Sequence, residues 1–477
     1  MKPVVALVGR PNVGKSTIFN RLTRSKKAIV HDEPGVTRDR HYGDVVSHGR
    51  SYILIDTGGF DPTSEDPMRQ GIKRQIELAI SEADVIVCVF DAMEPATNVD
   101  HAEMKLLRAA KKPTIYIANK ADSPKQEQDA ADLYRLGMEH LFYVSAAHGH
   151  GFDDLAEAIT EALPPVTDAE HEAPPADEGL LRVALIGKPN AGKSSLVNRL
   201  SGAERVLVDD RPGTTRAAVD TIVERKGKKY VFVDTAGIRR KAKVTKEGSF
   251  VEGASVVQAI RAMEHADVVV LLADAAEGVA EQDAKILGLA EERGRGIVIA
   301  LNKIDLVNER GGLAKAEEAT RDKISFAPWA PICRLSAKTG RGTDTLLETI
   351  EKVGASFVRR VPTGELNRFF GSVLETHPPP THGGRAPRLY FITQASSRPP
   401  TFVVSTSAPD KIHFSYRRYV QNQIRKAFAF EGVPVVVHYR GRGAGRKGKE
   451  EAGAPGAKAP RGKSKSKSKP RTPPSRK

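Results

Sequence analysis

The stretch LVGRPNVGKSTIFNRL at residues 7–22 decides the fold, and LIGKPNAGKSSLVNRL at 185–200 repeats it. Each contains Gly-x4-Gly-Lys-Ser, follows an apolar run and precedes an amphipathic one. In that strand–loop–helix context the glycines let the backbone wrap so that its N–H groups point at phosphates beside a helix N-terminus. One such loop can be a structural turn, but two in the same context predict two phosphate-binding sites.

Both halves of the chain alternate short apolar runs with amphipathic segments. The runs are VVALVG, YILIDT, DVIVCVFD, PTIYIANK and LFYVSA, then RVALIG, YVFVDT, DVVVLLAD, GIVIALNK and PICRLSA. Short, β-branched and almost wholly apolar runs are typical of strands buried on both faces of a mainly parallel sheet. We therefore expect an α/β fold with two doubly wound domains in tandem.

The spacing of further motifs supports a duplication. The two phosphate loops lie 178 residues apart, as do Asp-Thr-Gly-Gly at 56–59 and Asp-Thr-Ala-Gly at 234–237. The Asn-Lys-x-Asp motifs lie 183 residues apart and the Ser-Ala motifs 191. The order of motifs is kept while the offset grows, which is expected of a duplicated domain.

The Asn-Lys-x-Asp motifs indicate which base is bound. Each follows a buried strand, and its carboxylate can accept hydrogen bonds from both N1–H and the 2-amino group of guanine, whereas adenine offers neither donor. Leaving such a carboxylate unpaired can discriminate by up to about 10⁴–10⁵. Both domains are therefore predicted to be P-loop GTPase (G) domains, with the Ser-Ala motifs supplying a backbone N–H to the guanine oxygen.

The residues predicted to bind GTP follow from these motifs. At the first site they are Gly9, Arg10, Pro11, Asn12, Val13, Gly14, Lys15, Ser16, Asp56, Thr57, Gly58, Gly59, Phe60, Asn119, Lys120, Asp122, Ser145 and Ala146. At the second site they are Gly187, Lys188, Pro189, Asn190, Ala191, Gly192, Lys193, Ser194, Asp234, Thr235, Ala236, Gly237, Ile238, Asn302, Lys303, Asp305, Ser336 and Ala337.

Cations are expected at both sites. Mg²⁺ would be held by the loop serine, a switch threonine and the aspartate of the Asp-Thr motif, as in P-loop enzymes. These residues are Ser16, Thr37 and Asp56, then Ser194, Thr215 and Asp234. Phe60 and Ile238 stand where many GTPases carry a water-orienting Gln, so slow intrinsic turnover is expected. K⁺ held by Asn12 and Asn190 could stand in for an arginine finger.

The rest of the chain divides by composition. We predict a first G domain at 1–163, an acidic Pro-rich linker at 164–179, a second G domain at 180–353, a small α+β domain at 354–440 and a disordered tail at 441–477. The small domain has expected strands RLYFITQ, TFVVSTS and VPVVVHYR and a helix FSYRRYVQNQIRKAFAF.

Charge is concentrated at the C-terminal end. Residues 354–440 hold 12 basic against 4 acidic residues and 441–477 hold 13 against 2, whereas 1–353 carry a net −4. Such asymmetry is typical of a polyanion-binding end. The predicted RNA contacts are Arg417, Arg418, Arg425 and Lys426, and the aromatic residues between them are assigned to a core. No apolar run spans a bilayer and none resembles a leader, so a cytoplasmic protein without membrane contact is expected.

The two loops, both DT-x-G and both NK-x-D motifs, and the string RPPTFVVSTSAPDKIHFSYRRYVQNQIRKAFAFEGVPV resemble the Der/EngA family of tandem-G-domain GTPases over residues 1 to about 440. The resemblance implies a KH-like C-terminal domain, GTP hydrolysis dependent on Mg²⁺ and K⁺, and nucleotide-gated binding to ribosomal RNA during assembly of the large ribosomal subunit. Ala217 replaces the acid found at Asp39 in the first copy, and the KH-like domain lacks a GxxG loop.

Two alternatives stay open from the sequence. The chain could be an RNA-binding assembly chaperone in which one or both G domains bind GTP without appreciable turnover. A membrane-remodelling GTPase is disfavoured, because the basic C-terminal end offers no amphipathic helix with a wide apolar face. We expect a monomer whose ligands are GTP and GDP.

Overall fold

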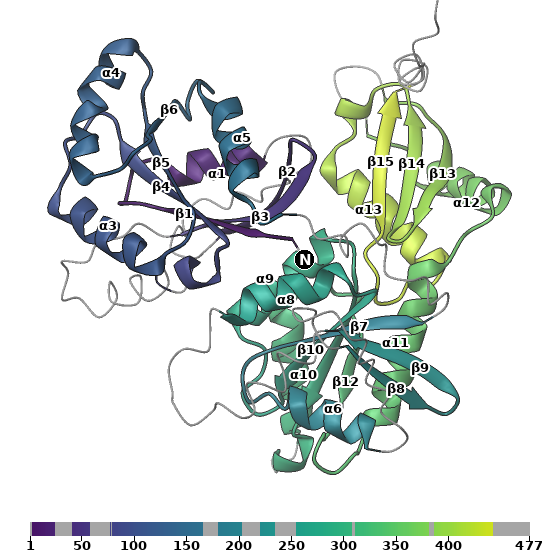
Figure 1. Ribbon diagram of the computed structural model, residues 1–477. Coiled ribbons are helices and arrows are strands. Elements are labelled where there is room, and N and C mark those ends of the chain that lie inside the picture. Colours follow the sequence, from purple (N-terminus) through teal and green to yellow (C-terminus); the bar gives the residue numbers. More distant parts are fainter. Residues whose placement is uncertain are drawn as a thin grey trace, which may run out of the picture. The chain divides into compact units, whose positions relative to one another are not determined.

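The computed structural model describes residues 2–23, 41–57, 77, 79–165, 180–202, 220–233, 254–307, 311–380 and 386–441. The chain forms two compact units: Met1–Arg359 with Ala429–Pro434, and Arg360–Phe428 with Val435–Lys477. The first unit holds both repeats and the second holds the small C-terminal domain (Figure 1).

The first repeat is built on a six-stranded sheet with the order β2-β3-β1-β4-β5-β6, in which β2 runs antiparallel to β3 and the other pairs are parallel. Its elements, with η marking a 3₁₀ helix, are β1 (Val4–Val8), α1 (Lys15–Thr23), β2 (His41–Ser47), β3 (Arg50–Asp56), β4 (Val85–Asp91), α3 (Asn98–Ala110), β5 (Thr114–Asn119), α4 (Pro124–Asp129), η1 (Ala130–Leu136), β6 (Phe142–Val144) and α5 (Phe152–Ala162).

Helices cover both faces of this sheet, which explains why its central strands are apolar throughout. All seven residues of β4 are buried. Val87 and Val89 pack on the side of α1 and α5, whereas Cys88 and Phe90 pack with α3 and η1. Because successive side chains of a strand alternate between faces, a strand with helices on both sides needs an unbroken apolar run.

The second repeat has the same plan, with the strand order β12-β11-β10-β7-β9-β8 and only β8–β9 antiparallel. Its elements are β7 (Leu181–Ile186), α6 (Lys193–Ser201), β8 (Thr221–Arg225), β9 (Lys228–Val233), α8 (Ala254–Glu264), β10 (Val268–Asp274), α9 (Glu281–Glu292), β11 (Gly296–Asn302), η3 (Ile304–Leu306), α10 (Gly312–Lys323), β12 (Ile332–Arg334) and α11 (Thr343–Val358).

The C-terminal domain is a three-stranded sheet in the order β13-β14-β15, with β13–β14 antiparallel and β14–β15 parallel. Its elements are α12 (Thr363–Thr376), β13 (Leu389–Ser397), β14 (Pro400–Thr406), η4 (Pro409–Lys411), α13 (Phe414–Ala427) and β15 (Val436–Gly441). Fully buried Phe402 and Val420 represent the core between the sheet and α13.

The predicted fold class and each predicted strand are confirmed. The sequence analysis missed β2 and β8, the edge strands joined to β3 and β9 by two-residue turns. These turns carry a positive-φ pair, His48–Gly49 and Lys226–Gly227, which favours a tight hairpin. Helix α11 continues through position 353 to Val358, and the C-terminal unit begins at Arg360.

Candidate nucleotide-binding sites

The first phosphate loop leaves the end of β1 and enters α1 at Lys15. Gly9 and Gly14 have φ of +147° and +94°, and a Cβ at either position would overlap the Val89 carbonyl oxygen or the Asn119 amide. Asn12, at the crown of the loop, is left-handed with φ +66°. The glycines are therefore required twice over, by backbone conformation and by close packing.

The second loop repeats this conformation between β7 and α6. Gly187 and Gly192 have φ of +135° and +99°, and a Cβ would overlap the Leu272 carbonyl oxygen or the Asn302 amide. Asn190 has φ +67° and is exposed, like Asn12. Both asparagines thus project from the crown of their loops, where we predicted K⁺ ligands.

The loop lysines lie inside their loops. Lys15 Nζ donates to the carbonyl oxygens of Gly9 at 2.9 Å and Arg10 at 2.6 Å. Lys193 Nζ donates to those of Gly187 at 2.5 Å and Lys188 at 2.6 Å. Burial lowers the pKa of Lys15. Each ammonium group donates to loop carbonyls, so it can turn its protons toward a phosphate entering the loop.

Ser16 and Asp56 meet at the first loop as expected for a Mg²⁺ site. Ser16 Oγ donates to Asp56 Oδ2 at 2.7 Å, while the buried Asp56 Oδ1 has no hydrogen-bond partner in the described part of the chain. Burial raises the pKa of Asp56. A hydroxyl beside a carboxylate with an unused oxygen fits a hard divalent cation, which prefers oxygen ligands and lowers the cost of burying the charge.

The asparagine of each Asn-Lys-x-Asp motif braces the site. Asn119 Nδ2 donates to the Val13 carbonyl oxygen at 2.8 Å, and its Oδ1 accepts from the Ala146 N–H at 3.0 Å. Asn302 makes the same pair of bonds, to Ala191 at 2.7 Å and from Ala337 at 2.9 Å. One buried amide therefore joins the phosphate loop to the Ser-Ala loop in each domain.

This brace refines the prediction for the Ser-Ala motifs. The N–H groups of Ala146 and Ala337 are already bonded to the asparagines, and those of Ser145 and Ser336 to carbonyl oxygens of the same loops. Ala147 follows next, and its N–H has no hydrogen-bond partner among the described residues; the same holds for Lys338 in the second copy. These two amides are therefore available as donors at the predicted position of the guanine oxygen.

The carboxylates predicted to read the base accept hydrogen bonds from the Ser-Ala serines. Ser145 Oγ donates to Asp122 Oδ1 at 2.5 Å. In the second domain a hydrogen bond from Ser336 lowers the pKa of the exposed Asp305. In both aspartates a serine hydroxyl therefore fixes the orientation of the carboxylate. At Asp305 the hydrogen bond also favours the ionised form, which can accept two guanine protons.

The lysines of the same motifs pair with acids that the sequence analysis missed. Lys120 Nζ lies 2.5 Å from Asp91 Oδ2, and Lys303 Nζ lies 2.8 Å from Asp274 Oδ2. Asp91 and Asp274 are the last residues of β4 and β10. An acid ending an apolar strand, repeated in both copies, was the signal that could have revealed them.

Two predicted site residues have structural contacts instead. Arg10 turns toward α3, with Nε 2.9 Å from Asp100 Oδ1 and Nη2 3.3 Å from Glu94 Oε2. Thr57 is buried and its hydroxyl donates to the Leu7 carbonyl oxygen at 2.6 Å. The following predicted residues lie outside the described part of the chain: Thr37, Gly58, Gly59, Phe60, Thr215, Asp234, Thr235, Ala236, Gly237 and Ile238.

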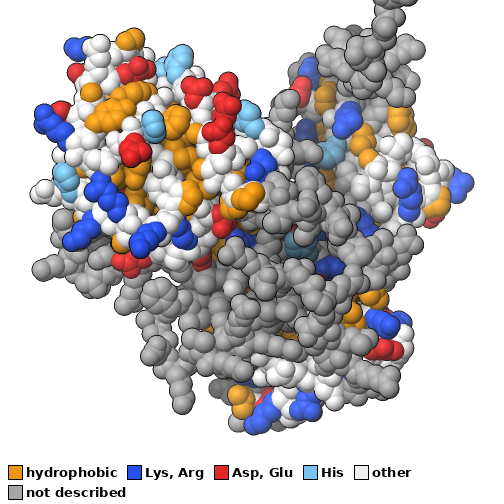
Figure 2. Space-filling model, viewed as in Figure 1, with side chains coloured by type: hydrophobic (Ala, Val, Ile, Leu, Met, Phe, Trp, Pro, Cys, Tyr) orange, Lys and Arg blue, Asp and Glu red, His pale blue; other side chains and the backbone are white. Residues whose placement is uncertain are grey.

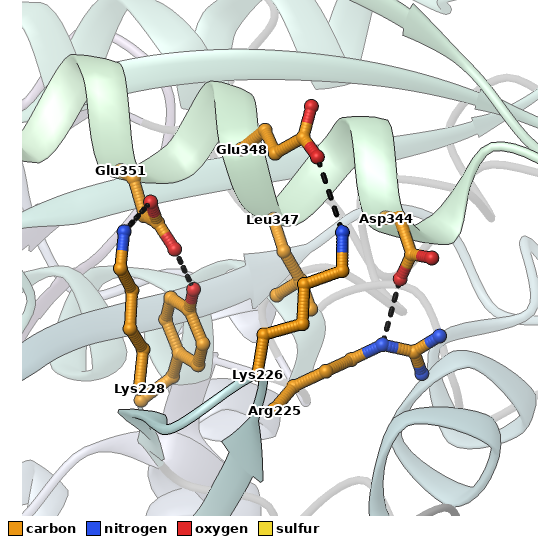
Figure 3. Close-up of a pocket in the computed structure, with 8 residues that line it drawn as sticks. Arg225, Lys226, Lys228, Asp344, Leu347, Glu348 and Glu351 are labelled. Atoms are coloured by element: carbon orange, nitrogen blue, oxygen red, sulfur yellow. Dashed lines mark hydrogen bonds and ion pairs between the residues drawn. The ribbon is translucent and has the colours of Figure 1, made fainter.

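A separate pocket of about 150 Å³ lies in the second domain between the β8–β9 hairpin and α11 (Figure 3). Three ion pairs cross it, in which Arg225, Lys226 and Lys228 of the hairpin meet acids of α11. Its basic and acidic groups neutralise one another, so these ion pairs hold the hairpin on α11. A smaller pocket, of about 30 Å³, opens at the second phosphate loop beside Asn190.

The predicted RNA-binding residues on α13 separate into two groups. Arg417 is half-buried, because its Nε and Nη2 donate to the carbonyl oxygens of Ile412 at 3.1 Å and Pro409 at 3.0 Å. Arg425 is also half-buried, whereas Arg418 and Lys426 are exposed. Figure 2 shows basic side chains and few acidic ones on the visible face of this domain.

The aromatic residues that were predicted to lie in a core are buried or half-buried. Tyr416 and Phe430 are buried, and the Tyr416 hydroxyl donates to the His377 carbonyl oxygen at 2.8 Å. Phe428 packs edge-on against Phe369 with ring centroids 5.0 Å apart. Phe414, by contrast, has 65% of its surface exposed.

Comparison with known proteins agrees with this arrangement. Residues 4–120 and 182–303 match the family described as "50S ribosome-binding GTPase", and 360–440 match the "KH-domain-like of EngA bacterial GTPase enzymes, C-terminal". GTPase Der of Geotalea daltonii is 45% identical over 449 residues, covering 94% of this chain and 100% of that protein. The chain belongs to the Der family of GTPases.

Other Der proteins are similar over the same length. GTPase Der of a Geobacter species is 46% identical, covering 93% of this chain and 99% of that protein. A solved structure of a probable GTP-binding protein engB aligns with a TM-score of 0.28 at 26% identity, covering 34% of this chain and 98% of that one. Membership of the Der family confirms the predicted resemblance, GTPase activity and KH-like domain. None of the described helices is long and apolar enough to cross a membrane.

Proposed function

We propose that this Der-family chain is a two-site GTP switch that gates binding of its KH-like domain to ribosomal RNA during assembly of the large ribosomal subunit. The observation that supports two working sites is the matched bracing by Asn119 and Asn302, each of which joins a phosphate loop to a Ser-Ala loop with hydrogen bonds of 2.7–3.0 Å. A degenerate second copy would be expected to lose one of these bonds. We propose that the protein acts in the cytoplasm as a monomer.

In the proposed mechanism the chain's own groups bind and orient the nucleotide. Loop N–H groups surround the phosphates, and Lys15 and Lys193 exchange carbonyl partners for phosphate oxygens. Asp122 and Asp305 accept the N1–H and 2-amino protons of guanine. Mg²⁺, which Ser16 and Asp56 would hold at the first site, supplies neutralisation of charge that develops on the phosphates.

Turnover is proposed to be slow, because Phe60 and Ile238 cannot orient a water molecule as Gln does. K⁺ at Asn12 and Asn190 would supply part of the missing positive charge. Phosphate release by Lys15→Ala and Lys193→Ala, each measured in K⁺ and in Na⁺, tests this. Each variant should keep the turnover of its intact site and be faster in K⁺; equal rates in the two salts would contradict the K⁺ proposal.

The RNA proposal is tested by co-sedimentation with large ribosomal subunits under GDP, GTP and a non-hydrolysable analogue. Wild type should bind differently in the three states. The double variant Arg418→Glu/Lys426→Glu should bind at least about tenfold more weakly, since each lost phosphate contact removes a favourable release of counterions, and its affinity should depend less steeply on salt. Arg135→Glu, at an arginine side chain 81% exposed on the first G domain, is the matched control. Binding independent of nucleotide, or equal loss in the control, would refute the proposal.

A further inference from the structure

One buried acid in the first G domain has no structural partner. Glu103, on α3, is completely buried, and neither of its carboxylate oxygens makes a hydrogen bond within the described part of the chain. Burying an ionised carboxylate without partners is costly, so such a group shifts toward its neutral form. Burial is the main cause that raises the pKa of Glu103 to about 8.

The neighbouring acid on the same helix shows what a structural role would look like. Asp100, also buried, has one oxygen 2.9 Å from Arg10 Nε, and the other accepts from the N–H and hydroxyl of Thr97 at 2.7 Å each. These contacts cap α3 and compensate the charge of Asp100. Glu103, one helical turn later, has no equivalent contact and does not contribute to the cap.

The second G domain lacks this acid. Asp91 and Asp274 end corresponding strands, and nine residues later Asp100 and Asp283 accept bonds at the N-termini of α3 and α9. Three residues beyond Asp283 stands Ile286, a buried residue of the apolar core. At this equivalent position, the first domain therefore has an ionisable carboxyl group and the second has an alkyl group.

Glu103 interacts electrostatically with groups of the phosphate loop, which contacts α3 through the Arg10–Asp100 ion pair. The charged and titratable groups that interact with it are Lys15 and Arg10 of the loop, Asp100 of its own helix and Cys88 of β4. Burial raises the pKa of Cys88 well above its ordinary value, so this thiol stays neutral. The cations that favour ionisation of Glu103 are thus the two loop residues, of which Arg10 is already paired with Asp100 and Glu94.

We propose that Glu103 takes up a proton when a nucleoside phosphate binds at the first site, so that binding there, and not at the second site, is coupled to pH. The inference rests on the proposed GTP site. Without phosphate, the Lys15 ammonium can stabilise the Glu103 carboxylate. A bound phosphate takes the ammonium and adds negative charge nearby, and a proton on the carboxyl oxygen of Glu103 then removes the repulsion.

Nucleotide affinity at the first site should depend on pH in one direction. Because phosphate disfavours the carboxylate, the pKa of Glu103 is higher in the complex than in the free protein, and binding takes up protons at a pH near 8. Affinity at the first site should fall as pH rises above that value, by at most about tenfold between pH 7 and 9.

Calorimetry of the full-length chain measures the proton directly. GDP with Mg²⁺ is titrated at pH 8 in two buffers of different ionisation enthalpy, into Lys193→Ala for the first site and Lys15→Ala for the second. At the first site we expect uptake of up to about half a proton per GDP, since a group with a pKa of about 8 is half ionised at that pH. Proton exchange by the nucleotide itself is common to both sites and cancels in the comparison.

Two further variants in the Lys193→Ala background decide the assignment. Glu103→Gln keeps the shape but cannot ionise, and Glu103→Ile introduces the side-chain type found at Ile286; both should bind GDP without the extra proton uptake. Uptake that persists in either variant, or equal uptake at the two sites, would overturn the inference while leaving the proposed function intact. Failure of the Lys193→Ala chain to bind GDP at any pH would overturn the proposed function and the inference together.

Discussion

Replacing Asn302 by Ala should destabilise the second G domain, because it removes both bonds of the brace. The Ala191 carbonyl and the Ala337 N–H would lose partners 2.7 and 2.9 Å away. Asn302 is only 1% exposed, so water cannot easily replace the amide. Each orphaned buried group costs about 1–3 kcal/mol, and with two such groups we expect a total loss of about 2–6 kcal/mol in the free energy of unfolding.

The single tryptophan, Trp329, lies in the second G domain, so its fluorescence follows urea unfolding of that domain in the full-length protein. With a denaturant dependence of about 2 kcal/mol/M, the transition midpoint should fall by about 1–3 M. Asn119→Ala makes the same change in the first domain and should leave the tryptophan transition in place. A shift below about 0.25 M for Asn302→Ala would refute the reasoning.

Two other predictions use the second domain. Ser336→Ala removes the hydrogen bond that lowers the pKa of Asp305, so this pKa should rise toward its ordinary value. GDP affinity should be unchanged at pH 7, but as the pH is lowered it should begin to decline at a higher pH than in wild type. Coinciding pH profiles of affinity for variant and wild type would contradict this. Burial opposes ionisation of Glu351, yet hydrogen bonds from Lys228 and Tyr230 outweigh it and lower its pKa. Glu351→Gln should therefore cost less than about 1 kcal/mol at pH 7, because the Lys228 side chain is 61% exposed and solvent screens the pair. The difference should vanish as pH falls below the folded pKa, and a constant difference down to pH 3 would count against it.

The sequence predicted the parts of the fold that periodicity encodes. Buried strands such as β4 and β10 have continuous apolar runs because helices cover both faces of the sheets. The edge strands β2 and β8 were missed because they are short of apolar residues: β2 has one buried position in seven. The signal for each hairpin is a two-residue turn that ends in glycine, His48–Gly49 and Lys226–Gly227, in which both residues have positive φ.

Side-chain direction limited prediction of the sites. The sequence identified Asn119 within a motif but could not show that its amide joins two loops, since both partners are backbone groups. Arg417 and Arg418 are adjacent in sequence, yet one clamps a turn and the other is exposed, because neighbours on a helix point about 100° apart. Glu103 lies at a position of α3 where the apolar pattern alone predicts a core residue.

Calorimetric titration of the wild-type chain with GDP and with ADP, both with Mg²⁺, tests the central claim most directly. Two braced loops, each with a guanine-reading carboxylate, predict two GDP molecules bound per chain at saturation and no measurable ADP binding. A stoichiometry below two, or ADP binding of comparable affinity, would contradict the account.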